Sequence, residues 1–236
     1  MTLINSPKPK IMAVVPAAGI GRRMQLAFPK QYIKIKNFTI LEYTLKTLLL
    51  HPNIVRIIVS LHQEDNYFHK LPISSDLRIL SVLGGPERIY SVLSGLMVKT
   101  DADLVMVHDA VRPCLSYKDL ENLISTAKNS KVGGILVRPV SDTIKCTDRT
   151  NQKILHTIPR KQLWHALTPQ LFPINLLRLC LKKIIQDQIT ITDESSALEY
   201  CGHYPEIVLG SHKNIKITYP EDIVFARLYL KDFFKK

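Results

Sequence analysis

The sequence predicts an α/β fold in which a mostly parallel, twisted sheet carries helices on both faces. Through the first half of the chain, short apolar runs of strand length alternate with segments of helical periodicity. The chain has 236 residues, of which 46% are hydrophobic and 22% charged, so its size and composition suit one large α/β domain. We therefore expect a Rossmann-like sheet in a single domain over residues 1–236.

The expected strands of the first half are short apolar runs between turn residues. They are Ile11–Val15, Val55–Leu61, Leu77–Val82, Leu104–His108 and Gly133–Val137. Continuous apolar runs of this kind are typical of strands whose two faces are both covered, as in a parallel sheet.

The expected helices between these strands each have an apolar stripe on one face. The stripes are Leu41, Leu45, Leu48 and Leu49, then Ile89, Val92, Leu93 and Leu96, and then Leu120, Leu123, Ile124 and Ala127. Ser116 can cap the third helix, because a serine hydroxyl accepts a backbone N–H of the first turn.

Residues 138–170 interrupt this alternation. Prolines punctuate a polar stretch that has only two short possible strands, Thr143–Cys146 and Ile154–Thr157. The stretch is long for a connection inside a compact domain, so we expect an extended β-arm.

Helices and strands resume after the arm. We expect helices at Asn175–Ile185 and near Asp193–Tyr200, the latter capped by Thr192, strands at Ile207–Leu209 and Ile215–Thr218, and a last helix that starts with Pro220.

Charge and composition narrow the class of protein. The net charge is +12, which suits nucleic acid, an anionic membrane surface or a phosphate-rich small substrate, or else a lysine-rich surface without a partner. The four cysteines form no C-x-x-C pair, so we expect neither a zinc site nor a disulfide scaffold.

No apolar run approaches the roughly 20 residues of a membrane helix, and the N-terminus does not resemble a signal peptide. We expect a cytoplasmic protein that has no membrane partner.

The first candidate binding loop follows the strand at 11–15. It reads PAAGIGRRM at 16–24, and PKQY follows at 29–32. Small residues let the backbone bend tightly and turn its N–H groups toward an anion, although both the dinucleotide and the phosphate-loop fingerprints fail. With Arg22, Arg23 and Lys30 beside it, the loop suits a triphosphate. An ordinary turn with exposed basic residues is the alternative.

Two further clusters follow strands and should lie at the same carboxyl edge of the sheet. The glycines of Gly84–Arg88, together with Ser91, would allow close approach of a nucleobase or ribose, unless this is a simple β–α turn. Asp109 offers a carboxylate for Mg²⁺ and Arg112 a cation for phosphate, unless the two form a buried ion pair. We expect His108, the other histidines and Trp164 to be structural.

Taken together, these clusters resemble the 2-C-methyl-D-erythritol 4-phosphate cytidylyltransferase family of the non-mevalonate isoprenoid pathway. The matching motifs are PAAGIGRRM at 16–24, PKQY at 29–32, GGPERIYSV at 84–92, VHDAVRPC at 107–114, PVSDTIK at 139–145, RKQLWHALTPQ at 160–170, TITDESSALEYCG at 190–202 and NIKITYPED at 214–222. The resemblance implies transfer of CMP from CTP to 2-C-methyl-D-erythritol 4-phosphate, with Mg²⁺ as the cofactor and a homodimer as the assembly.

The resemblance also implies roles for individual residues. The residues implied to hold CTP are Ala17, Ala18, Gly19, Gly21, Gly85 and Ser91. The charge of the loops adds Arg22 and Arg88 to them. Arg23 and Lys30 would be catalytic, because they would stabilise charge on the α-phosphate and the departing pyrophosphate. The residues implied to lie near the methylerythritol phosphate are Asp109, Ala110, Arg112, Thr143, Arg160, Thr168, Thr192 and Lys216. Asp109 would also bind Mg²⁺, and Thr143 and Arg160 would lie on an arm that serves the other subunit.

One position departs from the family pattern. Pro86 replaces a residue that is often small or acidic, so a contact through a backbone N–H or an acidic side chain is absent there. Two alternatives remain open. A cytidylyltransferase for another polyol phosphate, such as ribitol phosphate, would share most motifs. A basic nucleic-acid-binding module would explain the charge but not the glycine loops, and the sequence has no nucleic-acid-binding motif.

Overall fold

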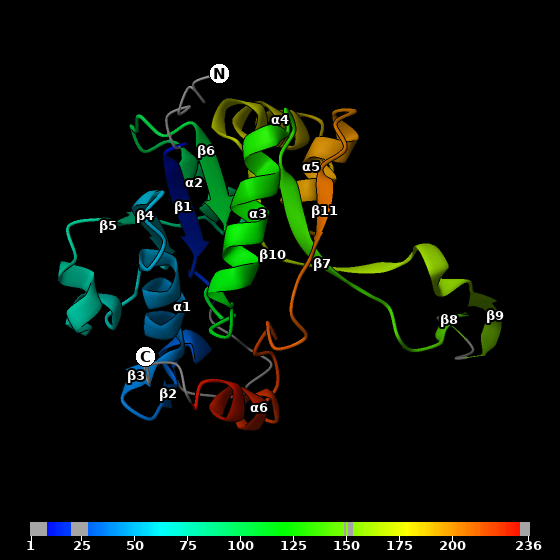
Figure 1. Cartoon of the computed structure of the whole chain (residues 1–236), viewed down its shortest axis with the longest axis horizontal. Coiled ribbons are helices and arrows are strands. Elements are labelled where there is room, and N and C mark those ends of the chain that lie inside the picture. Colours follow the sequence, from blue (N-terminus) through cyan, green and yellow to red (C-terminus); the bar gives the residue numbers. More distant parts are fainter. Residues whose placement is uncertain (1–8, 20–27, 149, 151–152, 232–236) are drawn as a thin grey trace, which may run out of the picture.

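The molecule is built around one central sheet. A computed structural model of the chain describes residues 9–19, 28–148, 150 and 153–231. In these ranges, seven strands form a sheet in the order β11-β7-β10-β6-β1-β4-β5 (Figure 1). The strands are β1 (Ile11–Pro16), β4 (Ile54–Leu61), β5 (Ile79–Leu83), β6 (Leu104–Val107), β7 (Gly134–Pro139), β10 (Trp164–Pro173) and β11 (Glu206–Leu209).

The strand directions confirm the predicted fold class. Strand β1 pairs in parallel with β4 and β6, β4 pairs in parallel with β5, and β11 pairs in parallel with β7. Only β10 among these seven strands runs antiparallel to its neighbours, β6 and β7. The carboxyl ends of β1, β4, β5 and β6 therefore meet at one edge of the sheet.

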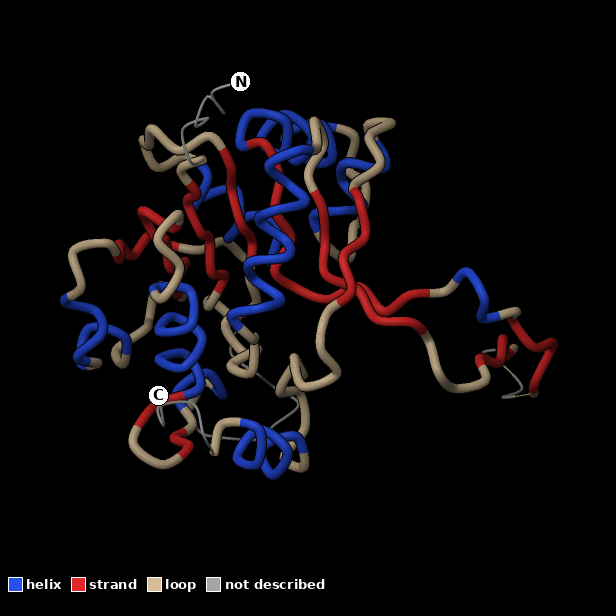
Figure 2. Tube along the Cα trace, in the orientation of Figure 1, coloured by secondary structure: helices blue, strands red, loops and turns tan. Residues whose placement is uncertain are grey.

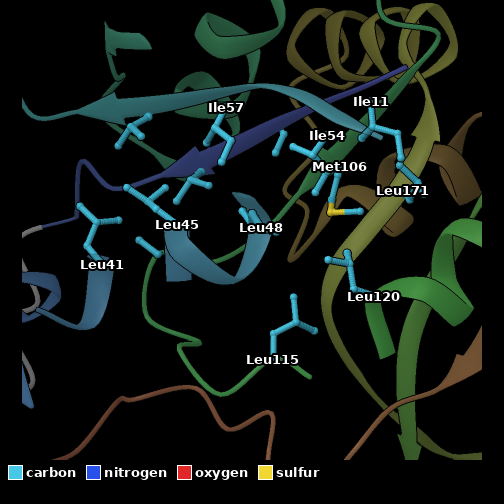
Figure 3. Packing of buried hydrophobic residues seen from close by; sticks show 14 of the residues in the cluster. Ile11, Leu41, Leu45, Leu48, Ile54, Ile57, Met106, Leu115, Leu120 and Leu171 are labelled. Atoms are coloured by element: carbon cyan, nitrogen blue, oxygen red, sulfur yellow. The ribbon is translucent and has the colours of Figure 1, made fainter. Parts of the chain in front are cut away.

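Both faces of the sheet are covered by apolar cores. Successive side chains of a strand point to opposite faces, so Ile11 and Ala13 pack in one cluster, whereas Met12 and Val14 pack in the other. In the first cluster, Leu41 and Leu45 lie against the sheet beside Ile57 (Figure 3). Burial on two sides is the reason that these strands read as unbroken apolar runs.

The helices divide between the two faces by their apolar stripes. Helices α1 (Ile40–Leu49) and α3 (Tyr117–Asn129) contribute to the first core, and α2 (Arg88–Leu96), α4 (Ile174–Gln186) and α5 (Glu194–Tyr200) contribute to the second. A third apolar cluster joins α6 (Asp222–Tyr229) to the small ribbon of β2 (Lys34–Ile35) and β3 (Phe38–Thr39). Among the described residues, no helix has both the length and the apolar character needed to cross a membrane.

Capping residues set where several helices begin. The Ser116 hydroxyl accepts the Asp119 N–H at 3.0 Å, as predicted. A capping box of Thr39 and Glu42 starts α1. The predicted cap of α5 was wrong by one residue, because the Asp193 carboxylate, not the Thr192 hydroxyl, accepts the Ser196 N–H at 3.1 Å.

Two other local predictions were wrong. Residues 215–218 form no strand, because Ile217 is buried in the third cluster and its N–H bonds the Val111 carbonyl instead of a ladder partner. The last helix starts at Asp222 and not at Pro220, since the Asp222 carboxylate accepts the N–H groups of Thr218 and Tyr219 just before it. Strand β10 was not among the expected strands, because the sequence analysis proposed only two short strands within residues 138–170.

The segment between β7 and β10 projects from the body of the molecule (Figures 1 and 2). It carries an antiparallel hairpin of β8 (Ile144–Thr147) and β9 (Ile154–Ile158). A short 3₁₀ turn (Arg160–Gln162) leads from the hairpin back toward β10. We call residues 140–163 the arm. Its large apolar side chains Ile154 and Leu155 are 62% and 63% exposed.

Candidate active site

The loops that follow β1, β5 and β6 surround a cavity of about 200 Å³, which we call the charged cavity. Because these strands are parallel, their loops meet at the carboxyl edge, where ligands of open α/β sheets bind. The predicted site residues that line it are Ala17, Ala18, Gly19, Lys30, Gly85, Arg88, Ser91, Asp109, Ala110 and Lys216. Gly21, Arg22 and Arg23 lie outside the described residues.

Gln31 fixes the loop after β1. Its buried side-chain amide donates to the Ala17 carbonyl at 2.7 Å and to the Gly19 carbonyl at 3.3 Å. The neighbouring Lys30 ammonium donates to the Ile217 carbonyl at 2.8 Å and thereby joins the loop to the C-terminal segment. The sequence reasoning missed Gln31, although its position inside the PKQY motif was a signal.

The two glycines after β5 are required by close packing. A Cβ at Gly84 would lie 2.7 Å from the Ala18 Cβ, and a Cβ at Gly85 would lie 2.2 Å from the Tyr90 Cβ. The Gly85 N–H donates to the Ser91 hydroxyl at 3.1 Å. These contacts bring the loop after β5 directly against the loop after β1.

Three cations converge on the carboxylate of Asp109. Its Oδ1 accepts from Arg88 Nε and Nη2 at 3.3 and 3.2 Å. Its Oδ2 accepts from Arg112 Nε at 3.4 Å and lies 2.9 Å from Lys216 Nζ. Burial alone would raise the pKa of Asp109, but Arg88, Lys216 and Arg112 outweigh it and hold the pKa well below its usual range. The cluster carries an excess of positive charge, which suits an anion.

Arg88 is shared between two carboxylates. Besides Asp109, its guanidinium contacts Oε1 of Glu194, the first residue of α5. Glu194 is fully buried, and burial raises its pKa although Arg88 opposes this. Its other oxygen, Oε2, has no hydrogen-bond partner among the described residues. The sequence reasoning also missed Glu194, although it lies in the TITDESSALEYCG motif.

A buried chain of hydrogen bonds holds the backbone of Asp109. The Thr168 hydroxyl accepts the Asp109 N–H at 3.0 Å and lies 3.0 Å from His108 Nδ1. His108 Nε2 lies 3.2 Å from the Arg112 carbonyl, which can only accept, so the proton is on Nε2 and Thr168 donates to Nδ1. Burial lowers the pKa of His108 to about 4, so the ring is neutral at physiological pH. His108 is a packed residue, as predicted.

Asp109 does not fit a metal ion in this arrangement. A carboxylate has about four lone-pair sites, and the contacts from Arg88, Arg112 and Lys216 already take up both oxygens. In the part of the chain that the structure describes, no group of three or more His, Cys, Asp or Glu residues could hold a metal. The role of Asp109 as a Mg²⁺ ligand stays a prediction, and it requires at least Lys216 to move away.

The remaining predicted residues lie away from the charged cavity. Thr143 and Arg160 belong to the arm, where the exposed Arg160 guanidinium contacts the Ser141 carbonyl. Thr192 lines a separate cavity of about 340 Å³ that is also lined by Arg88 and Glu194. None of the three lines the charged cavity of its own chain.

Comparisons with known proteins agree on one family. A family model described as IspD, 2-C-methyl-D-erythritol 4-phosphate cytidylyltransferase, matches residues 11–232. A protein of that name from Buchnera aphidicola subsp. Schizaphis graminum is 77% identical over 235 residues, which cover 100% of both chains. Its namesake from Serratia proteamaculans is 50% identical over 222 residues, 94% of each chain. The solved structure of the Francisella tularensis cytidylyltransferase superposes with a TM-score of 0.81 at 34% identity, over 94% of this chain and 100% of that one.

Proposed function

Because the chain belongs to the 2-C-methyl-D-erythritol 4-phosphate cytidylyltransferase family, we propose that it transfers CMP from CTP to 2-C-methyl-D-erythritol 4-phosphate. The products would be 4-diphosphocytidyl-2-C-methyl-D-erythritol and pyrophosphate. One structural observation supports this reaction at the charged cavity. The side chains of Arg88, Arg112 and Lys216 surround Asp109 beside a loop of small residues. Both substrates are phosphate anions, and this is the charge that such a cluster attracts.

The chemistry needs no protein base. A phosphomonoester has its second pKa at about 6, so the acceptor phosphate is already a nucleophile at neutral pH. One of its oxygens attacks the α-phosphorus of CTP in line. The bond from that phosphorus to the oxygen bridging to the β-phosphate breaks, and pyrophosphate leaves with the electron pair. What the site must supply is compensation for the repulsion between two anions.

The proposed roles follow the position of each side chain. We assign Lys30, with Arg23 outside the described residues, to the charge that develops on the α-phosphate and the leaving pyrophosphate. The small-residue loop at 17–19 would hold the nucleotide, together with Gly85 and Ser91. The acceptor would lie near Asp109 and the residues that surround it, namely Ala110, Arg112, Thr168 and Lys216.

A divalent cation such as Mg²⁺ usually takes substrate phosphates as ligands. Since the Asp109 oxygens are engaged by three cations, we propose that the metal arrives with the triphosphate, where it would neutralise part of the phosphate charge. The protein cations perform the remaining neutralisation.

The arm has a proposed role between subunits. Thr143 and Arg160 lie outside the charged cavity of their own chain, and the arm projects from the body (Figure 1). We propose a homodimer in which the arm of one subunit brings these two residues to the acceptor site of the other. The exposed apolar side chains of the hairpin would be covered in that assembly.

Pyrophosphate release tests the proposed function. The purified protein, supplied with CTP and Mg²⁺, should release pyrophosphate only when 2-C-methyl-D-erythritol 4-phosphate is added. Faster release with ribitol phosphate would assign the protein to another polyol phosphate. Salt-dependent binding to nucleic acid, with no release under any of these conditions, would favour the non-enzymatic alternative.

A further inference from the structure

A larger cavity of about 680 Å³ opens beside the charged cavity, and we call it the uncharged cavity. The two cavities share Ala18, Gly19, Gly85 and Pro86. The end of β4 adds His62, which follows Leu61 directly. Among the described residues that line this second cavity, none is Lys, Arg, Asp or Glu.

The difference in charge between the two cavities indicates where each part of a nucleotide would bind. The charged cavity has Lys30, Arg88 and Lys216 in its wall and suits phosphate groups. The base and sugar carry no charge, so they belong in the neighbouring uncharged cavity. This step rests on the proposed function, because it takes the ligand to be CTP.

The loop after β5 can offer the base mainly hydrogen-bond acceptors. The Gly84 N–H already donates to the Leu61 carbonyl at 2.7 Å, and the Gly85 N–H donates to the Ser91 hydroxyl at 3.1 Å. Pro86 has no N–H. The carbonyl oxygens of these residues can accept from the cytosine amino group, but cytosine also presents two acceptors, O2 and N3. A donor for them must come from elsewhere in the cavity.

His62 has such a donor. Its Nδ1 accepts the Glu64 N–H at 3.2 Å, so in the neutral ring the proton is on Nε2. No hydrogen bond of the described residues uses Nε2. We propose that His62 is a specificity-determining residue that donates from Nε2 to the acceptor edge of the cytosine base. Sequence reasoning treated this histidine as structural.

The kinetic test replaces the donor. His62→Ala should raise the KM for CTP about two- to tenfold, which is the effect of one neutral hydrogen bond, and should leave kcat and the KM for the sugar phosphate within about twofold. His62→Gln keeps an N–H donor and should restore most of the CTP affinity. His69→Ala, at an exposed histidine outside the cavity, is the matched control. The assignment is wrong if His62→Ala leaves the KM for CTP unchanged. It is also wrong if His62→Gln raises the KM for CTP as much as His62→Ala does.

A binding measurement separates base recognition from phosphate binding. Calorimetric titration without sugar phosphate should show that His62→Ala weakens CTP binding but leaves inorganic tripolyphosphate binding unchanged, because tripolyphosphate has no base. Equal weakening of both ligands would overturn the proposal. The titration needs no turnover, so it can succeed or fail independently of pyrophosphate release, on which the proposed function depends.

Discussion

Asp109 is the residue on which the charged cluster is centred. Arg88, Arg112 and Lys216 come from three separate segments of the chain, and each contacts this one carboxylate. Without it, three like charges would face one another at short range. The carboxylate therefore holds the cations in the positions in which a phosphate would meet them.

The first residue-scale prediction concerns the pH dependence of stability. Asp109→Asn should lower the free energy of unfolding at pH 7 by about 2 kcal/mol, because it removes the carboxylate partner of the buried Arg112 and the partly buried Arg88. The pKa of Asp109 is lower in the folded chain than the ordinary value of about 3.9 in the unfolded chain, so its contribution is present above pH 3.9 and is lost as the pH falls through the folded value. Urea unfolding of the wild type and of Asp109→Asn at a series of pH values measures this contribution. A gap between the two proteins that widened below pH 4 would contradict this assignment.

The second residue-scale prediction concerns Lys30, which lines the charged cavity. Lys30→Ala should lower kcat about 100-fold at saturating CTP, since a preorganised cation is lost where charge develops. Pyrophosphate release measures the rate. Lys34→Ala is the control, because Lys34 is exposed and does not line the charged cavity. Turnover near that of the wild type in Lys30→Ala would remove Lys30 from the catalytic machinery.

At the scale of elements, close approach of α2 to the sheet positions Arg88 at the start of the helix. Gly95 of α2 faces β1, and a Cβ there would lie 2.6 Å from Val14 Cγ1. We expect Gly95→Ala to lower the free energy of unfolding by about 1 kcal/mol, because overpacking outweighs the gain in helix propensity.

A double-mutant cycle checks the cause of that loss. If the clash with Val14 is responsible, Gly95→Ala combined with Val14→Ala should cost less than the sum of the two single changes. Urea unfolding gives all three values. Strict additivity would show that the loss comes from elsewhere.

The arm is the other element with a function of its own to test. Arg160→Ala should raise the KM for the sugar phosphate about tenfold with little change in kcat, since a charged ground-state contact to its phosphate is removed. Lys161→Ala, the exposed neighbour on the same turn, is the matched control. An unchanged KM for the sugar phosphate in Arg160→Ala would exclude this contact.

Two elements differ from what the sequence pattern predicted. Strand β10 was missed: its first residues are exposed, and a register shift between Ala166 and Gln170 breaks its pairing with β7, so it does not have the continuous apolar run of the other strands. The apolar alternation at 215–218 looked like a strand, but Ile217 packs in a cluster with α6 and forms no ladder. Periodicity records which side chains are buried, and not whether a strand lies beside them.

At the scale of the whole molecule, mixing two impaired variants tests the arm exchange. In a heterodimer of Lys30→Ala with Arg160→Ala, one site would receive both defects and the other would receive neither. At low sugar phosphate, such heterodimers should therefore regain activity from about one of their two sites. A double variant with both changes in one chain, mixed with the wild type, is the control, because each heterodimer site then keeps one defect. No recovery in purified heterodimers would contradict the exchange.

By itself, the sequence determined the fold class and the loops that carry the site. Buried parallel strands must be apolar along their whole length, and the loops after them must meet at one edge, so Lys30, Arg88 and Asp109 could be expected together. Only the tertiary structure decided how they are held. Glu194 reaches Arg88 across 106 residues, Gln31 donates to the carbonyls of Ala17 and Gly19, and Thr168 accepts the Asp109 N–H across 59 residues. Contacts of this kind depend on which side chains the packed elements bring within about 3 Å, and periodicity and composition do not encode that.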